Sequence, residues 1–460
     1  MPGRNEYFKR GITQGNVSYG WVNGTSDDST RTIALTQGSA PLSFCEDTDY
    51  VYGGYLRREV PPAATSVEIT IFKIAKANGS VSKAVYSANV ASSNLTGSCG
   101  RLAIYGNWLY SYWVIGLSGT GLSFGSPFIL RHNKSDLSFD TTFKGVPDKG
   151  ALLAMEGAGT YSMAYHSGLS QLGDYAYGYD TGCRFFKYNM ATGALTYQID
   201  MRGTITASPT AQCLVDVAGA YLYAVGTEYN DVEILKANEA DGTYAAASRL
   251  TMTGKASITA TSIIEKPDGN LILAGSSNTV APVYNGFVAE VTADLATVIL
   301  CKEDAAGAPA NIVFSLGTYG FMLYGYNGSS YLYTVYDWNW NLLFRFTSGL
   351  PIPRAVKYDP VTDTLQWLTA GLVLGKTGQN LLLFAQIDKF AAFTGKIQTS
   401  DGTVYLEKVT VAEFLTDVAG PGFTTGIGSA ASTALSETVS GIETFSTIST
   451  MLDYAHETIS

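Results

Sequence analysis

The chain has 460 residues and a formal net charge of −10, and only 15% of its residues are charged, whereas it contains 30 tyrosines and 49 glycines. Typical globular domains carry about 25% charged residues, so this composition predicts a surface that contacts neighbouring molecules or sugars. The negative charge and the absence of a Lys/Arg cluster argue against a nucleic-acid partner, and no segment approaches the roughly 18 apolar residues of a membrane-spanning helix.

Residues 1–30 are the first predicted unit, an N-terminal arm that lacks the strand rhythm of the following sequence. Glycines at positions 11, 15, 20 and 24 interrupt this arm, and a polar loop ends it. Its beginning contains no apolar segment of the kind found in a secretory signal, which favours synthesis in a reducing cytoplasm. We expect part of the arm to pair into the last repeat of the fold and close it, with residues 403–409 as the other candidate for that strand.

Residues 31–408 repeat a unit of four short strands about every 50 residues. In the clearest copy, residues 262–300, a polar turn at 267–269 separates the first two strands and a second turn at 292–294 separates the last two. Four short strands at this period are the signature of a β-propeller blade.

Seven copies of the unit align on one position in their second half. These anchor positions are Ile71, Ile129, Phe185, Glu233, Phe287, Leu332 and Leu383. We therefore predict an all-β fold, a β-propeller of about seven four-stranded blades with a short C-terminal helical tail. Six or eight blades, a pair of β-sandwiches and a β-helix are the alternatives, because short strands with turn signals occur there too.

The unit around Pro267 resembles the delta-60 type propeller repeat, in which a Pro-Asp-Gly turn leads into a strand that ends Ala274-Gly275-Ser276. Residues 128–140 are similar to the same repeat. The resemblance supports the propeller fold and implies no activity, because one fold hosts many functions.

Two groups of tryptophans are candidate ligand contacts. Trp108 and Trp113 flank a run of aromatic residues, and Trp338 and Trp340 lie in a predicted turn. Exposed rings in such places stack on sugars or anchor protein contacts. Packing within the blades is the alternative for each of these rings.

Catalytic residues are scarce. The three histidines, at 132, 166 and 456, accompany neither a nucleophile-elbow motif nor a His-Glu-x-x-His motif. Four carboxylates fall at blade positions where an axial pair could serve a glycosidase: Asp174, Asp180, Asp216 and Glu265. The five cysteines form no Cys-x-x-Cys pair, which indicates free thiols. We expect no enzymatic activity, no metal site and no cofactor.

The C-terminal segment contains no Lys or Arg after Lys408. Residues 409–432 are predicted to be a Gly-rich linker. Beyond them, apolar residues recur at steps of three and four, which predicts one amphipathic helix over 433–460. Its apolar stripe is the candidate partner-binding surface: Leu435, Val439, Ile442, Phe445, Ile448, Leu452 and Ile459. Packing of this helix on the chain's own propeller is the alternative.

These features favour a non-enzymatic structural protein that contacts other structural proteins or copies of itself. The low charge, the Tyr/Gly/Thr-rich β-body and the arms at both ends are similar to those of phage or virus tail and surface-appendage proteins. That similarity implies a place in a virion made in the host cytoplasm. The alternatives are a lectin-like propeller that binds surface glycans, extracellular or at a cell surface, and a polysaccharide-degrading propeller enzyme.

Overall fold

The structure is a computed structural model of the whole chain. It describes residues 20–26, 31–33, 44–59, 66–77, 79–89, 95–98, 102–117, 124–140, 168–180, 184–200, 208–216, 218–228, 231–278, 284–304, 312–326, 331–348, 353–371, 381–392, 394–398, 404–409, 415–418, 421–425, 433–434, 446–448 and 455–459. In part of these ranges the backbone alone is described.

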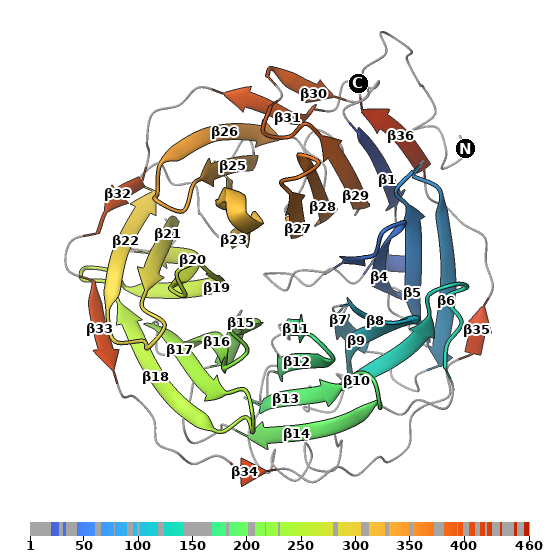
Figure 1. Ribbon diagram of the computed structural model, residues 1–460, viewed down its shortest axis with the longest axis horizontal. Helices are drawn as coiled ribbons and strands as arrows, with labels where there is room; N and C mark the ends of the chain where they lie inside the picture. Colours follow the sequence, from blue (N-terminus) through green and yellow to red (C-terminus); the bar gives the residue numbers. More distant parts are fainter. Residues whose placement is uncertain are drawn as a thin grey trace.

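The described strands form seven antiparallel sheets that stand around a central axis (Figure 1). In each sheet the first strand lies nearest the axis, and the following strands lie progressively further out. Each sheet is one blade, and the blades follow one another around the ring in chain order. The predicted all-β propeller with seven four-stranded blades is confirmed.

The first three blades contain the following strands, from the axis outward. Blade one has β2 (Arg31–Ile33) and β3 (Cys45–Glu46) on the inner edge of β4 (Tyr50–Glu59), then β5 (Ser66–Ala75) and β6 (Val81–Asn89). Blade two has β7 (Leu95–Ser98) and β8 (Leu102–Tyr105) on the inner edge of β9 (Trp108–Leu117), then β10 (Phe124–Asn133) and a single bridge between His132 and Phe139. Blade three has β11 (Gly168–Leu172), β12 (Tyr175–Asp180), β13 (Arg184–Asn189) and β14 (Ala194–Asp200).

The other four blades continue this order. Blade four has β15 (Ser208–Val215), β16 (Tyr221–Glu228), β17 (Asp231–Asn238) and β18 (Tyr244–Thr251). Blade five has β19 (Ser257–Glu265), β20 (Leu271–Asn278), β21 (Tyr284–Val291) and β22 (Val298–Asp304). Blade six has β23 (Ile312–Ser315), the short 3₁₀ helix η1 (Gly317–Tyr319), β24 (Phe321–Tyr326), β25 (Tyr331–Tyr336) and β26 (Leu342–Ser348). Blade seven has β27 (Pro353–Asp359), β28 (Thr364–Gly371), β29 (Leu381–Asp388) and the N-terminal strand β1 (Gly20–Ser26).

Strand β1 closes the ring. It pairs antiparallel with β29, so that Gly20 lies opposite Ile387 and Ser26 lies opposite Leu381. The expected pairing of the N-terminal arm with the last blade is confirmed. The alternative strand, 403–409, instead contributes β31 (Val404–Val409), which pairs with β26 of blade six. The arm and the propeller are therefore not separate units, because one blade contains strands from both.

The seven anchor positions all fall in the third strand of their blades, which explains their regular spacing. In blades one and three, a glycine on the second strand faces a phenylalanine on the third. A Cβ atom on Gly53 would lie 2.2 Å from the Phe72 ring, and one on Gly178 would lie 2.0 Å from the Phe186 ring. Glycine is required at both positions because the ring occupies the space of a side chain.

In blades two to six the turn between the third and fourth strands contacts the preceding blade. In three blades this turn contains a bulky residue in the left-handed region, namely Leu137, Leu295 and Trp340. That conformation is strained for such residues, so packing must compensate. Leu137 and Leu295 are each 1% exposed. The Leu295 carbonyl accepts a hydrogen bond from Ser248 of blade four, with an oxygen–oxygen distance of 2.6 Å.

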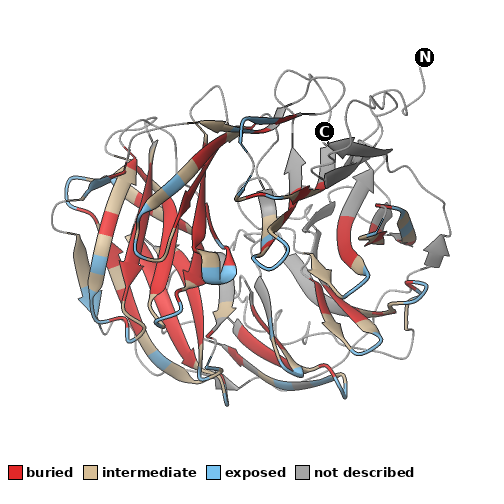
Figure 2. Cartoon of the chain, turned by 45° about the horizontal axis from the view of Figure 1, so that its top comes forward, coloured by how far each residue is buried: buried red, intermediate tan, exposed pale blue. Residues whose placement is uncertain are grey.

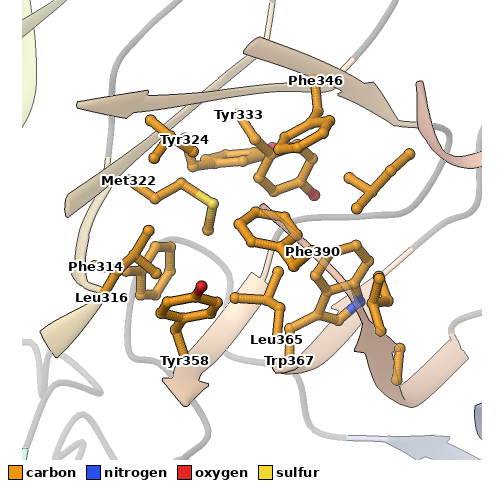
Figure 3. Close-up of a cluster of buried hydrophobic side chains, with 14 of the residues drawn as sticks. Phe314, Leu316, Met322, Tyr324, Tyr333, Phe346, Tyr358, Leu365, Trp367 and Phe390 are labelled. Carbon is orange, nitrogen blue, oxygen red and sulfur yellow. The ribbon is translucent and has the colours of Figure 1, made fainter. Parts of the chain in front are cut away.

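The blades pack against one another through aromatic clusters. Figure 2 shows that buried residues dominate the inner and middle strands, whereas the outer strands alternate between buried and accessible residues. In the cluster between blades six and seven, Trp367 stacks on Tyr333 with ring centroids 5.9 Å apart and an interplanar angle of 1° (Figure 3). Phe390 lies 5.0 Å from Phe346 in the same cluster. These contacts join neighbouring blades into one continuous core.

Candidate interaction surface

The C-terminal segment passes around the outside of the propeller as a series of short strands. After the hairpin strand β30 (Lys396–Gln398) come β31, β32 (Leu415–Asp417), β33 (Gly422–Thr425), β34 (Thr433–Ala434), β35 (Ser446–Ile448) and β36 (Ala455–Ile459). We refer to β31–β36 as the C-terminal belt. Figure 1 shows these strands at the periphery of the ring.

Each belt strand pairs antiparallel with the outermost strand of a blade. Its partners, in chain order, are β26, β22, β18, β14, β6 and β1. The belt therefore pairs with blades six, five, four, three, one and seven, in that order. It runs around the ring in the direction opposite to that in which the chain forms the blades. No belt strand on blade two is among the described residues. The last strand, β36, covers β1, so β1 lies between β29 and β36.

A few apolar side chains anchor the belt. Leu406 is fully buried in the cluster between blades six and seven, and Leu415 is 5% exposed beside blades five and six. Val418 and Phe423 pack partly buried against the core of blades four and five. The remaining described belt side chains contribute little burial, and Thr416, Asp417, Thr424 and Thr425 are exposed.

Polar contacts also join the belt to the blades. Asp417 Oδ1 lies 3.7 Å from Lys302 Nζ, and the Thr416 hydroxyl donates to the Glu303 carbonyl over 3.3 Å. The Lys408 ammonium lies 4.5 Å above the centre of the Phe344 ring. The belt is thus held by backbone pairing, a few apolar anchors and exposed polar contacts.

Within the predicted helix over 433–460 the structure describes only residues 433–434, 446–448 and 455–459, and these three stretches are strands; the rest of the predicted helix lies outside the described residues. Ile448 lies opposite Val85 and Ile459 opposite Gly20, so the backbones of both residues pair with the chain's own propeller rather than with a partner. The other five residues of the stripe, Leu435, Val439, Ile442, Phe445 and Leu452, lie outside the described residues. The physical reason is composition: the segment is rich in Ser and Thr, which are weak helix formers, and the open blade edges offer backbone partners.

Trp338 and Trp340 lie in the turn between β25 and β26. The Trp338 indole N–H donates to the Gly317 carbonyl over 3.0 Å, and the Trp340 indole N–H donates to Glu290 Oε2 of blade five over 2.6 Å. Both rings contact Phe321, with centroids 5.8 Å and 4.9 Å away. The contacts of these two residues therefore favour packing within and between blades, which is the alternative to ligand contact.

Glu290 is the centre of a buried polar cluster between blades five and six. It is 3% exposed, and its carboxylate also receives hydrogen bonds from Lys266 Nζ at 2.7 Å and Asn270 Nδ2 at 3.3 Å. Burial disfavours the charged form of Lys266, but the hydrogen bond and the charge of Glu290 outweigh it and raise the pKa of Lys266 above its usual value. The charged form of Lys266 is therefore stabilised inside this cluster.

The other two candidate tryptophans lie in β9. The Arg131 guanidinium lies 4.4 Å above the centre of the Trp108 ring, and Arg131 Nε donates to Asp140 Oδ2 over 2.9 Å. The Trp113 backbone pairs with Phe128 of β10, and its side chain lies outside the described part of the chain. Trp108 thus stacks on a cation of its own blade.

Three blades contain a repeated lysine contact that was not predicted from the sequence. In blades one, three and four a lysine of the third strand lies opposite a tyrosine of the second: Lys73 opposite Tyr52, Lys187 opposite Tyr177, and Lys236 opposite Tyr223. Each lysine reaches the turn of the next blade; Lys187 binds Glu239 at 2.6 Å and Lys236 donates to the Ala293 carbonyl at 3.0 Å. The recurrence of Tyr-x-Tyr with a lysine one strand later was the available signal.

The histidine that sequence analysis considered for catalysis is buried. His132 Nε2 lies 2.9 Å from Ser111 Oγ, but both residues are 0% exposed, so a substrate has no access to the pair. Burial lowers the pKa of His132 to about 3. Asp216, one of the four carboxylates considered for an axial pair, is 8% exposed and accepts a hydrogen bond from the Ala220 backbone N–H at 2.7 Å.

Cys45 and Cys301 are free thiols, as predicted for them, and burial raises the pKa of Cys301 to about 12. Among the described side chains, no group of three or more His, Cys, Asp or Glu is placed to hold a metal ion. In the same part of the chain no helix is long and apolar enough to cross a membrane.

The fold and the belt define the chain as a seven-bladed β-propeller, and in the described structure its own C-terminal segment covers the outer edges of six blades. The chain matches no protein-family model, and no curated protein matches its sequence. The similar solved structures include a chain of the mitotic checkpoint complex, with a TM-score of 0.47 and 8% identity over 84% of this chain and 99% of that one. The WD40 domain of Toxoplasma gondii coronin has a TM-score of 0.45 and 12% identity over 81% of this chain and 87% of that one. Chaetomium thermophilum Raptor has a TM-score of 0.42 and 9% identity over 80% of this chain and 30% of that one. At these identities the likeness concerns the fold alone.

Proposed function

We propose that the chain is a non-enzymatic structural protein that makes protein–protein contacts in a phage or virus tail or surface appendage. Its partners are other structural proteins or further copies of itself. It is made in the host cytoplasm and acts in the virion. The low charged fraction of 15% supports this role, because a surface poor in charge suits permanent contact with neighbours better than free dispersion.

The observation that carries the proposal is the C-terminal belt. The outer strand of a blade presents a row of unpaired backbone N–H and C=O groups, on which another chain can form a strand. The belt covers this edge on six blades of the described structure. In an assembly, copies lie side by side at high local concentration, where open edges would pair at random. Covered edges leave the turns and loops of the propeller for specific contacts.

The contacts of the candidate site residues favour this role over the two alternatives. A lectin-like role would use Trp338 and Trp340, but the indole N–H groups of both are donated within the propeller. An enzymatic role that used His132 would need substrate access to it, but His132 and Ser111 lie in the core of blade two. Surface contacts between proteins require neither an exposed histidine nor a sugar-binding ring.

The test is the presence of the chain in particles. Particles from a culture that expresses the chain are separated on a density gradient, and the chain is quantified by mass spectrometry in each fraction. We expect it to follow the major structural proteins at a constant ratio across the particle peak and to stay bound after a high-salt wash, which screens weak charge contacts. Recovery only at the top of the gradient, as free protein, would overturn the proposal.

A further inference from the structure

The outer edges of the blades are strand-acceptor sites, and the belt occupies them through short pairings. Two residue pairs join β34 to β14, three join β32 to β22, and three join β35 to β6. Four join β33 to β18. Antiparallel pairing joins the backbones in each case, and any strand in the same register can form such backbone hydrogen bonds.

In β32 and β33, whose side chains the structure describes, apolar contact with the propeller comes from one buried residue, Leu415, and from the partly buried Val418 and Phe423. Leu415 is the one buried residue of β32, whereas the neighbouring Thr416 and Asp417 are exposed. In β33, Phe423 is partly buried and Thr424 and Thr425 are exposed. Elements with few buried contacts open at a small fraction of the global free energy of unfolding. The belt can therefore leave its edges while the blades remain folded.

Charge selects the blade edge, rather than another belt, as the partner of a released belt. The segment after Val409 contains six acidic residues and no Lys or Arg, so two belts repel each other. The edge of blade five offers a cation in register: Lys302 of β22 lies opposite Asp417, with 3.7 Å between their charged groups. A released belt is thus attracted to a blade edge, and every copy of the chain presents the same edges.

We propose that belts are exchanged between copies, so that the C-terminal segment of one copy pairs with the blade edges of a second copy in the register seen here. This inference rests on the proposed structural role, which brings copies together. The contacts are the same within one chain and between two chains, which makes exchange a low-cost route to association. A short linker gives the chain's own belt an effective concentration of the order of millimolar, so exchange dominates where neighbouring copies are packed at comparable density.

The experiment uses two full-length chains that differ in size by a tag. One carries Lys302→Cys as the acceptor, and the other carries Asp417→Cys as the donor. The two chains are mixed, concentrated and placed under oxidising conditions. When the belt of one chain lies on blade five of the other, the two introduced cysteines face each other and can form a disulfide between the chains. We expect a covalent heterodimer whose fraction rises with protein concentration, and no heterodimer when either chain is mixed with unmodified protein.

The matched control replaces the donor by Thr416→Cys. Successive side chains of a strand point to opposite faces, so a cysteine at 416 points away from position 302. We expect at least about a tenfold lower heterodimer yield from this pair, because a disulfide requires Cβ atoms that face each other. An equal yield would show that the cross-link reports random collision and would overturn the proposal.

A single chain with both substitutions, Lys302→Cys and Asp417→Cys, distinguishes the remaining outcomes. Complete cross-linking within this chain, with no heterodimer from the mixed chains at any concentration, would show that the belt never exchanges and would overturn the proposal. Failure of this chain to cross-link would overturn it as well, because the register would be wrong. Heterodimers from a chain that is absent from particles would support exchange and reject the structural role proposed above.

Discussion

Individual polar side chains hold neighbouring blades together. Tyr223 and Lys236 of blade four both donate to the Ala293 carbonyl in the turn of blade five, each over 3.0 Å. At the junction of the first and last blades, Glu46 binds Lys76 at 2.6 Å and also pairs with Lys357 of blade seven. These contacts are partly buried, so they are screened less by salt than surface ion pairs. Each such residue therefore stabilises a junction rather than a single blade.

The Trp340 contact with Glu290 should dominate the junction between blades five and six. Trp340→Phe keeps a ring beside Phe321 but removes the donor to a carboxylate that is 3% exposed. We expect a loss of about 1.5–3 kcal/mol in the free energy of unfolding, the usual range for a hydrogen bond to a buried charge. Urea unfolding followed by fluorescence measures it.

Trp338→Phe is the matched control for this variant. The Trp338 indole N–H donates to the Gly317 carbonyl at an exposed site, so its removal should cost about 1 kcal/mol or less. If both variants lost the same free energy of unfolding, the hydrogen bond from Trp340 to the buried carboxylate would stabilise the fold no more than the exposed one from Trp338.

The stability of the propeller should fall as pH is lowered, because His132 is buried without its proton. Burial lowers its pKa from 6.5 to about 3 in the folded chain. Below pH 6.5 the unfolded chain binds a proton that the folded chain does not. The free energy of unfolding should therefore have its full value above pH 6.5. Below pH 6.5 it should decrease by about 1.4 kcal/mol per pH unit towards pH 3. Urea unfolding at several pH values between 4.5 and 7.5 measures this slope.

Two variants identify the source of the slope. His132→Gln removes the titrating group and should flatten the dependence between pH 4.5 and 6.5. Ser111→Ala removes only the hydroxyl 2.9 Å from His132 Nε2, so it should lower stability by about 1 kcal/mol at every pH and leave the slope unchanged. An unchanged slope in His132→Gln would assign the pH dependence to other groups.

At the scale of secondary-structure elements, the sequence predicted the blades well and the belt poorly. The anchors Phe185 and Phe287 both lie in third strands because strand pairing within a blade is local and repeats with the blade. The belt pairs elements far apart in the chain, such as Thr447 with Tyr86, and no repeat signals such contacts. Steps of three and four among the apolar residues suggested a helix, but the partners that decide the conformation are the edges of distant blades.

The first belt strand should behave as part of the core, unlike the later belt. Leu406 of β31 is 0% exposed and belongs to the aromatic cluster between blades six and seven. Leu406→Ala should lower the free energy of unfolding by about 2–5 kcal/mol, the range for removal of a buried leucine side chain. The measurement is urea unfolding with far-ultraviolet circular dichroism.

Thr416→Ala, in the next belt strand, is the control. Its side chain is exposed, so the change should stay within about 0.5 kcal/mol. If Leu406→Ala lowered the free energy of unfolding as little as Thr416→Ala, β31 would not be an integral element of the core.

In the whole molecule, two strand pairings close the ring. Strand β1 completes blade seven, and β36 then pairs with β1, opposing Gly20 to Ile459 and Gly24 to Ala455. The first and the last described strands therefore lie side by side in one blade, and the belt connects that blade with the edges of five others in the described structure. Such an arrangement links the opening of the ring to the release of the belt, because β1 loses one of its two neighbours when β36 leaves.

Removal of the belt after β31 should increase the self-association of the propeller. A chain that ends at Val409 keeps β31 and its buried Leu406 but uncovers the outer edges of β22, β18, β14, β6 and β1. Uncovered edges pair with other chains, so light scattering should rise with concentration while the circular dichroism of the blades is retained. A chain that ends at residue 454 uncovers β1 alone. It should scatter far less and show faster hydrogen exchange confined to β1 and its neighbour β29. If the chain ending at Val409 remains as monodisperse as the full chain at the same concentration, the belt does not protect the blade edges.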